Sequence, residues 1–202
     1  MTSLSTLVER LRRAAHSGES TRDCAVVLSE FIDEGGVELL DDPFHPARRD
    51  RVEGLIAPIA STNELSVVIA RSAPGLTTVP QRHELPVVLG ILSGRVAVDV
   101  FMETDSSDAV DKAESVEIDA GEVYVIEPDV IHDVRFVGDE PGSAIHVVLG
   151  DLGRTERSRW VDRRHQRVAP SLAYPLSALP MAEVEPAVPD EGDSEDYSDA
   201  TA

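Results

Sequence analysis

The sequence contains a single cysteine and no long apolar run. Cys24 is the only cysteine among 202 residues, which excludes a disulfide framework and a thiolate-rich zinc site. No segment approaches the roughly 18 uncharged apolar residues of a membrane span. The first apolar region carries Glu9, Arg10, Arg12 and Arg13, unlike a signal peptide. We therefore expect a cytoplasmic protein without a membrane partner, in which any metal ion is held by His, carboxylate or amide groups.

Basic residues are also scarce. The chain has 18 Lys and Arg against 38 Asp and Glu, a formal net charge of −20. A phosphate backbone requires a basic binding face, so DNA and RNA are excluded as partners. Eight of the acidic residues follow Arg167, where no Lys or Arg remains. We expect this Pro- and acid-rich tail, 169–202, to be disordered, because it cannot bury enough apolar area to offset its ordering entropy.

Helical spacing of apolar residues dominates the first part of the chain, and we predict a helical N-terminal segment over residues 1–62. Leu7, Val8, Leu11 and Ala15 have the spacing of one helix face. Thr21 can cap a second helix, which ends at Gly35 and Gly36. A third helix is predicted from about Pro46 to Ala60, since proline suits the first helical turn.

Short β-rich segments separated by turn residues follow, and they predict an all-β barrel over 63–168. Closely and regularly spaced strands of this kind are typical of a sandwich or barrel. A polar loop is expected at 104–113. The predicted strands are 64–71, 86–92, 94–102, 114–118, 122–127, 131–137 and 143–149.

Two of these segments carry candidate metal ligands. Gln81 and His83 stand at positions i and i+2, so in a strand both point to the same face. His132 comes early in the returning strand of a strand–turn–strand unit and can reach the same cavity from across the barrel. We predict that these three side chains hold one metal ion.

These segments resemble the motifs of the cupin superfamily. Gly75, five residues, Gln81-Arg82-His83 and a later Gly94 keep the spacing of the first cupin motif, with Gln in place of the first His and Val87 in place of the Glu. The absence of the Glu makes the sequence most similar to the cysteine dioxygenase group of thiol dioxygenases. Two further segments support that likeness: Pro128-x-x-Ile-His132-x-Val and Ser143-Ala-Ile-His146-Val-Val. The resemblance covers about residues 64–152.

The resemblance implies a cupin double-stranded β-helix, or jelly roll, with Gln81, His83 and His132 as metal ligands. The group's Ser-x-His-x-Tyr relay corresponds here to Ala144, His146 and Val148, so only His146 is left for a catalytic role beside the metal. A Cys–Tyr crosslink, found in some members, is impossible.

The implied reaction is O₂-dependent oxidation of a small thiol, first of all L-cysteine, with Fe(II) as cofactor and Ni(II) or Mn(II) as the other metals. Three neutral ligands leave open positions for a thiolate and O₂. The product is a sulfinate or a further oxidised or cleaved sulfonate. A substrate carboxylate requires a guanidinium group. The substrate-binding candidates are Arg157, Arg71, Arg82 and Tyr124.

Two alternatives stay open at this point. The replaced ligand and relay also suit another metal-cupin enzyme, such as a nickel or manganese oxygenase or an isomerase acting on a small metabolite. They equally suit a non-catalytic cupin that binds a small molecule. Whether the chain forms a homodimer is left open as well.

Overall fold

The computed structural model describes residues 3–36, 55–72, 77–105, 109–161 and 164–168, which form two helices and two antiparallel β-sheets. The helices are α1 (Leu4–Ala15) and α2 (Ser20–Asp33). The five-stranded sheet contains, in spatial order, β1 (Leu55–Ser61), β2 (Ser66–Ser72), β9 (Gly142–Val148), β4 (Val87–Ser93) and β7 (Val123–Ile126). The six-stranded sheet contains β11 (Arg164–Val168), β10 (Arg157–Val161), β3 (Gln81–Arg82), β8 (Ile131–Val137), β5 (Arg95–Glu103) and β6 (Val110–Asp119).

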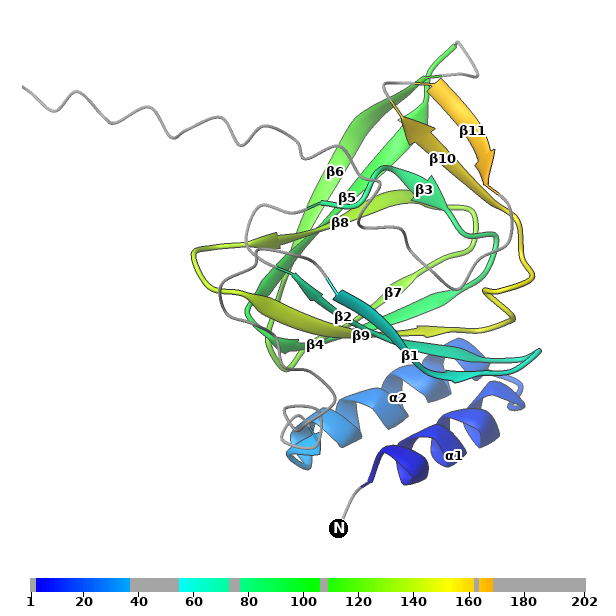
Figure 1. Cartoon of the computed structure of the whole chain (residues 1–202), viewed down its shortest axis with the longest axis vertical. Coiled ribbons are helices and arrows are strands. Elements are labelled where there is room, and N and C mark those ends of the chain that lie inside the picture. The colour runs from blue at the N-terminus through cyan, green and yellow to red at the C-terminus, as the bar shows by residue number, and fades with distance from the viewer. Residues whose placement is uncertain (1–2, 37–54, 73–76, 106–108, 162–163, 169–202) are drawn as a thin grey trace, which may run out of the picture.

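The strand order defines a jelly roll. Apart from the β5–β6 hairpin, which lies within one sheet, the central strands alternate between the two sheets along the chain, giving β2-β9-β4-β7 opposite β3-β8-β5-β6. This arrangement of eight strands in two facing sheets is the double-stranded β-helix. Figure 1 shows the two sheets facing each other, with β4 in one and β8 in the other. The predicted all-β jelly roll with N-terminal helices is therefore confirmed.

The two helices cover the outer face of the five-stranded sheet (Figure 1). The side chain of Ser3 caps α1 by accepting a hydrogen bond of 3.1 Å from the Thr6 amide. Gly90 permits the close approach of α2, because an added Cβ would lie 2.7 Å from Leu28 Cδ2. The helix–sheet core consists of Leu7, Leu11, Cys24, Leu28, Phe31, Val67, Ile69, Val88, Ile145 and Val147 among others. This sheet is consequently buried on both faces.

A second apolar core fills part of the barrel interior. It joins the inner face of the five-stranded sheet to the inner face of the six-stranded sheet. Its members include Val68, Leu89, Ile91 and Val148 from the first sheet, and Val96, Val98, Val134 and Phe136 from the second. Side chains of a strand alternate between faces, so these two sets identify which residues point inward.

The predicted third helix is wrong where the structure describes it. Residues 55–60 belong to β1, which pairs with β2 from Leu55↔Arg71 to Ser61↔Ser66. A strand partner satisfies the backbone groups of this segment, and its one proline, Pro58, lies at a register shift. The remainder of the predicted helix, 46–54, lies outside the described residues, as does the predicted tail, 169–202.

Two further segments differ from the prediction. The polar loop at 104–113 is shorter, because β6 begins at Val110 and pairs with β5. The hairpin of β10 and β11 was not predicted as strands, and it extends the six-stranded sheet. Within the described part of the chain, neither helix is long and apolar enough to cross a membrane.

Candidate functional site

Two buried histidines lie side by side in the interior. The ring centres of His83 and His132 are 5.1 Å apart, and their planes meet at 38°. His132 stands on β8 at alternate positions with Val134 and Phe136, both in the interior core. His83 follows β3 directly. The two residues are only 3% and 2% exposed, so they face a cavity or each other and not bulk solvent.

Gln81 is the backbone partner of His132 across β3 and β8. Residues directly opposite in an antiparallel pair have their side chains on the same face, so Gln81 shares the interior face with His132. It is buried at 8% exposure. The three predicted ligands are thus brought to one region, and their binding of a metal stays a prediction.

His146 approaches from the opposite sheet. It lies on β9 between Val68 of β2 and Leu89 of β4, and both neighbours belong to the interior core. The Nε2 atom of His146 is buried. Ala144 and Val148, two residues away on the same strand, are fully buried, so His146 is the polar group on the inner face of β9.

Burial keeps the three imidazoles neutral. It lowers the pKa of His132 and of His146 to about 4. Burial also holds the pKa of His83 well below 6.5, with the neighbouring His132 and the charge of Arg157 acting in the same direction. Neutral imidazole is the form that binds metal ions, so these groups are ready to act as ligands near neutral pH.

These shifts predict that acid destabilises the metal-free protein. Between pH 6.5 and 4 the unfolded chain protonates all three histidines, whereas the folded chain does not, so stability falls as pH falls. Asp133 opposes this effect, because burial and the adjacent Asp99 raise its pKa to about 7. With net uptake of about two protons on unfolding, the free energy of unfolding should drop by about 2–3 kcal/mol per pH unit. Urea titrations of chelator-treated protein measure this slope.

Two histidine variants provide the controls for this measurement. His146→Asn should reduce the slope by about one proton. His16→Asn should change it little, because the backbone oxygen of Arg12 raises the pKa of His16 above its ordinary value, so acid does not destabilise the folded state through this group. A stability that does not fall from pH 6.5 to 4.5 would contradict the neutrality of these rings in the folded protein.

Arg157 lies beside the histidine pair. It begins β10, and its neighbour at i+2, Arg159, is the partner of Gln81, so Arg157 is on the same face as Gln81. It is 5% exposed, and its charge acts on His83. Arg157 also lines a pocket of about 270 Å³ together with Glu84, Glu156 and Ser158. The two glutamates were not among the predicted site residues, and no motif in the sequence marks them.

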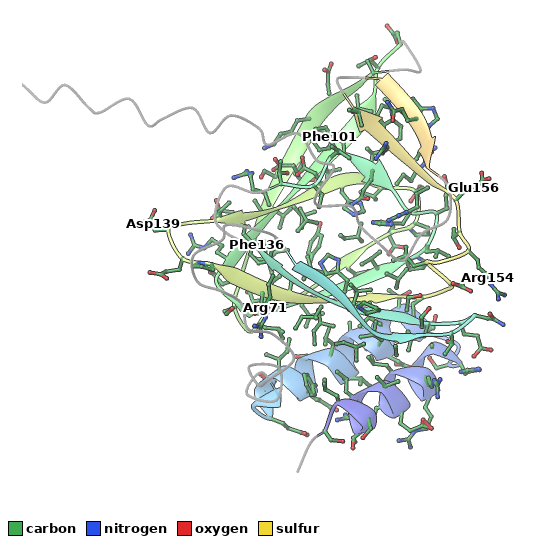
Figure 2. The ribbon with its side chains drawn as sticks, viewed as in Figure 1. Arg71, Phe101, Phe136, Asp139, Arg154 and Glu156 are labelled. Carbon is green, nitrogen blue, oxygen red and sulfur yellow. The ribbon has the colours of Figure 1, made fainter. Side chains whose placement is uncertain are left out.

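The structure places Arg71 and Arg82 away from the histidines, and their contact with a substrate stays a prediction. Arg71 alternates with Val68 along β2 and therefore lies on the helix side of the sheet, where Figure 2 shows it. Arg82 follows Gln81 and points to the opposite face. There it makes ion pairs of 3.1 Å with Glu84 and 3.3 Å with Glu103. Strand alternation thus separates both guanidinium groups from the histidines.

Tyr124 lies on the interior face of β7. It pairs with Leu89, which in turn pairs with His146, so the three residues form one row across the sheet. Tyr124 packs against the interior core. Tyr124 therefore lines the interior on the strand next to β4, and its contact with a substrate stays a prediction.

The histidine pair fits a metal ion. Two imidazoles bonded at about 2.1 Å to neighbouring positions of one ion have ring centres about 4.5–5.2 Å apart, and the observed separation is 5.1 Å. Among the described residues, no three His, Cys, Asp or Glu side chains could hold a metal together. A third protein ligand would therefore be the amide of Gln81. Two neutral nitrogens and one amide oxygen suit a divalent first-row ion such as Fe(II), Mn(II) or Ni(II).

No family model matches the chain, and no curated protein matches it in sequence. Solved structures resemble it distantly. Oxalate oxidase in complex with glycolate is 19% identical with a TM-score of 0.41, over 50% of this chain and 53% of that one; the chain thus spans about half the length of this enzyme. An RmlC-like cupin family protein from Methanocaldococcus jannaschii is 11% identical with a TM-score of 0.42, over 55% and 92% of the two chains. A cupin superfamily protein from Desulfitobacterium hafniense is 15% identical with a TM-score of 0.43, over 57% and 87%.

Proposed function

We propose that the chain is a cupin of the cysteine dioxygenase-like group, which uses Fe(II) and O₂ to oxidise a small thiol at sulfur. L-cysteine is the first substrate to test. The product is a sulfinate, formed by the balanced reaction RSH + O₂ → RSO₂⁻ + H⁺, or a more oxidised or cleaved sulfonate. The observation that carries the proposal is the buried pair of His83 and His132, with Gln81 and Arg157 on the same face.

The residues that would hold a metal ion do not neutralise it. His83, His132 and Gln81 carry no charge, so the charge of a bound divalent ion would remain available to attract a thiolate. When bound, the ion would supply the redox chemistry that joins O₂ to sulfur. The backbone oxygen of Val130 lies 3.2 Å from His132 Nδ1, and this bond orients the ring so that Nε2 is left to face the ion.

The remaining side chains bind and enclose the substrate. Arg157 offers a buried guanidinium group beside His83, which suits a substrate carboxylate. His146 faces the pair from the other sheet as a neutral imidazole that can exchange a hydrogen bond with the substrate. Val68, Leu89 and Val148 keep water away from this region.

Ala144 and Val148 favour a second candidate. Neither residue carries the hydroxyl group that the thiol dioxygenases have beside the corresponding histidine, so the relay of that group is not reproduced around His146. A cupin that uses nickel or manganese to convert a small metabolite does not depend on that hydroxyl. The metal that the protein retains separates the two candidates.

Metal analysis combined with oxygen uptake tests the proposal. Protein purified without added metal should contain iron near one ion per chain, measured by mass spectrometry. It should consume one O₂ per thiol with at least one of L-cysteine, cysteamine, 3-mercaptopropionate and mercaptosuccinate. Stoichiometric nickel or manganese would support the second candidate. Bound metal without oxygen uptake for any thiol would exclude thiol oxidation and leave a non-catalytic binding protein.

A further inference from the structure

The pocket beside the histidines has an acidic rim and a basic floor. Its lining residues are Glu84, Glu156, Arg157 and Ser158. The two glutamates are exposed, whereas Arg157 and Ser158 are buried at 5% and 4% exposure. A ligand in this pocket therefore meets one guanidinium group inside and two carboxylates outside.

Glu84, one of the two acidic residues of the rim, is held in a defined place next to His83. Glu84 follows His83 directly and has a backbone φ of 59°, and it is the one non-glycine residue in the described chain with a positive φ. Such a conformation persists only where the surrounding structure holds it, and it is concentrated at functional sites. The carboxylate of Glu84 is further fixed by Arg82 at 3.1 Å. Its position relative to His83 is therefore defined.

We propose that Glu84 and Glu156 form a binding site for a protonated amine, so that the pocket selects a ligand carrying both an ammonium group and a carboxylate. This inference rests on the proposed function for the thiol, and it adds the residues that distinguish an amino-acid thiol from a thiol acid. Arg157 binds the carboxylate, and the glutamates bind the ammonium group.

The charges and the volume of the pocket support this ligand class. The carboxylates of Glu84 and Glu156 are balanced by the guanidinium groups of Arg157 and of Arg82, which pairs with Glu84 at 3.1 Å. A ligand that carries one ammonium group and one carboxylate preserves this balance, whereas a carboxylate alone adds an uncompensated negative charge. The volume of about 270 Å³ equals about nine water molecules at roughly 30 Å³ each. An amino acid with a short side chain fits that space, and a nucleotide or a fatty acid does not.

Two thiols that differ in a single group test the inference. L-cysteine is 3-mercaptopropionate with an added ammonium group, so the ratio of their dissociation constants isolates that group. Calorimetry under argon on the metal-loaded protein measures binding without turnover. Wild-type protein should prefer L-cysteine by about fivefold or more. Glu84→Gln and Glu156→Gln should each weaken L-cysteine binding about threefold, with 3-mercaptopropionate binding unchanged or stronger.

Glu103→Gln is the matched control. Glu103 also forms an ion pair with Arg82, at 3.3 Å, but it does not line the pocket. This variant removes an Arg82 contact without changing the rim and should leave the preference intact. A preference that survives in both rim variants, or an equal loss for both thiols, would overturn the inference.

A pair of ligands without sulfur separates this inference from the proposed oxidation. L-alanine and propionate differ by the same ammonium group, and NMR titration detects their weaker binding. Preference for L-alanine without oxygen uptake by any thiol would keep the amine site and reject thiol oxidation. Oxygen uptake with no preference in either ligand pair would keep the oxidation and reject the amine site. Absence of binding by all four ligands would reject both.

Discussion

Replacing His132 with alanine is expected to abolish metal binding. His132 and His83 are the two described imidazoles close enough to share an ion, at 5.1 Å between ring centres, and the alanine variant leaves only one. Groups that merely orient a ligand change metal affinity by about 10- to 100-fold, so removal of a ligand should weaken binding by more than about 100-fold. Metal content after dialysis, together with competition against a chromophoric chelator, measures the loss. Thiol-dependent oxygen uptake should disappear with the metal.

Two further variants provide references against which the loss of metal binding in His132→Ala is compared. Gln81→Ala should weaken metal binding less than His132→Ala, because an amide oxygen is a poorer ligand than an imidazole. His16→Ala removes a surface histidine that contacts Glu64 at 3.0 Å, and it should leave the metal content unchanged. Circular dichroism would establish that each variant is folded. One metal ion per chain in the His132→Ala protein would show that this residue is not a ligand.

Replacing Gly90 with valine is expected to separate the helices from the sheet. A Cβ at this position would lie 2.7 Å from Leu28 Cδ2 and 3.0 Å from Ile32 Cδ1, and the further methyl groups of valine have no free space. Forcing extra groups into a packed core destabilises proteins by about 1–3 kcal/mol. For a domain of this size the Tm should fall by roughly 4–8 °C. Differential scanning calorimetry of the metal-free protein measures the change.

A double-mutant cycle identifies the cause of that loss. Leu28→Ala alone also destabilises, because it empties a fully buried position. If the introduced valine clashes with Leu28, the combined variant should be more stable than the sum of the two single losses predicts. Gly18→Ala is the control, because a Cβ there meets no atom within 4 Å. Strictly additive losses would mean that Gly90 matters for another reason, such as strand geometry.

The sequence predicted the central strands of the two sheets well and the edge strands β1 and β6 poorly. β4, β5, β8 and β9 lie within one or two residues of their predicted bounds, because their apolar residues are buried against a core. β6 is exposed along most of its length, so its polar start resembled a loop. β1 combines alanine and isoleucine with a proline, a composition that also fits a helix. Its pairing with β2 makes this segment a strand and not a helix, and that contact cannot be read from the local sequence.

The sequence predicted the two histidines of the candidate site, but it did not predict which charged residues lie around them. His83 and His132 fall at motif positions and lie together in the structure. For the arginines, proximity along the chain was a poor guide, since strand alternation sends Arg71 to the helices and Arg157 inward. The acidic rim of Glu84 and Glu156 is made by residues 72 positions apart, each of which looks like an ordinary surface charge in the sequence.

The pairing of β2 with β9 has a consequence for biosynthesis. It joins Ser66 to Val148 and Val68 to His146, so the barrel cannot close until residue 148 has left the ribosome. At about 5–20 residues per second, the segment with His83 spends several seconds outside before its opposing wall exists. Such distant pairings also fold slowly, over milliseconds to seconds. During that interval His83 is open to solvent, and β9 is the last of the core strands whose pairing encloses the proposed metal ligands.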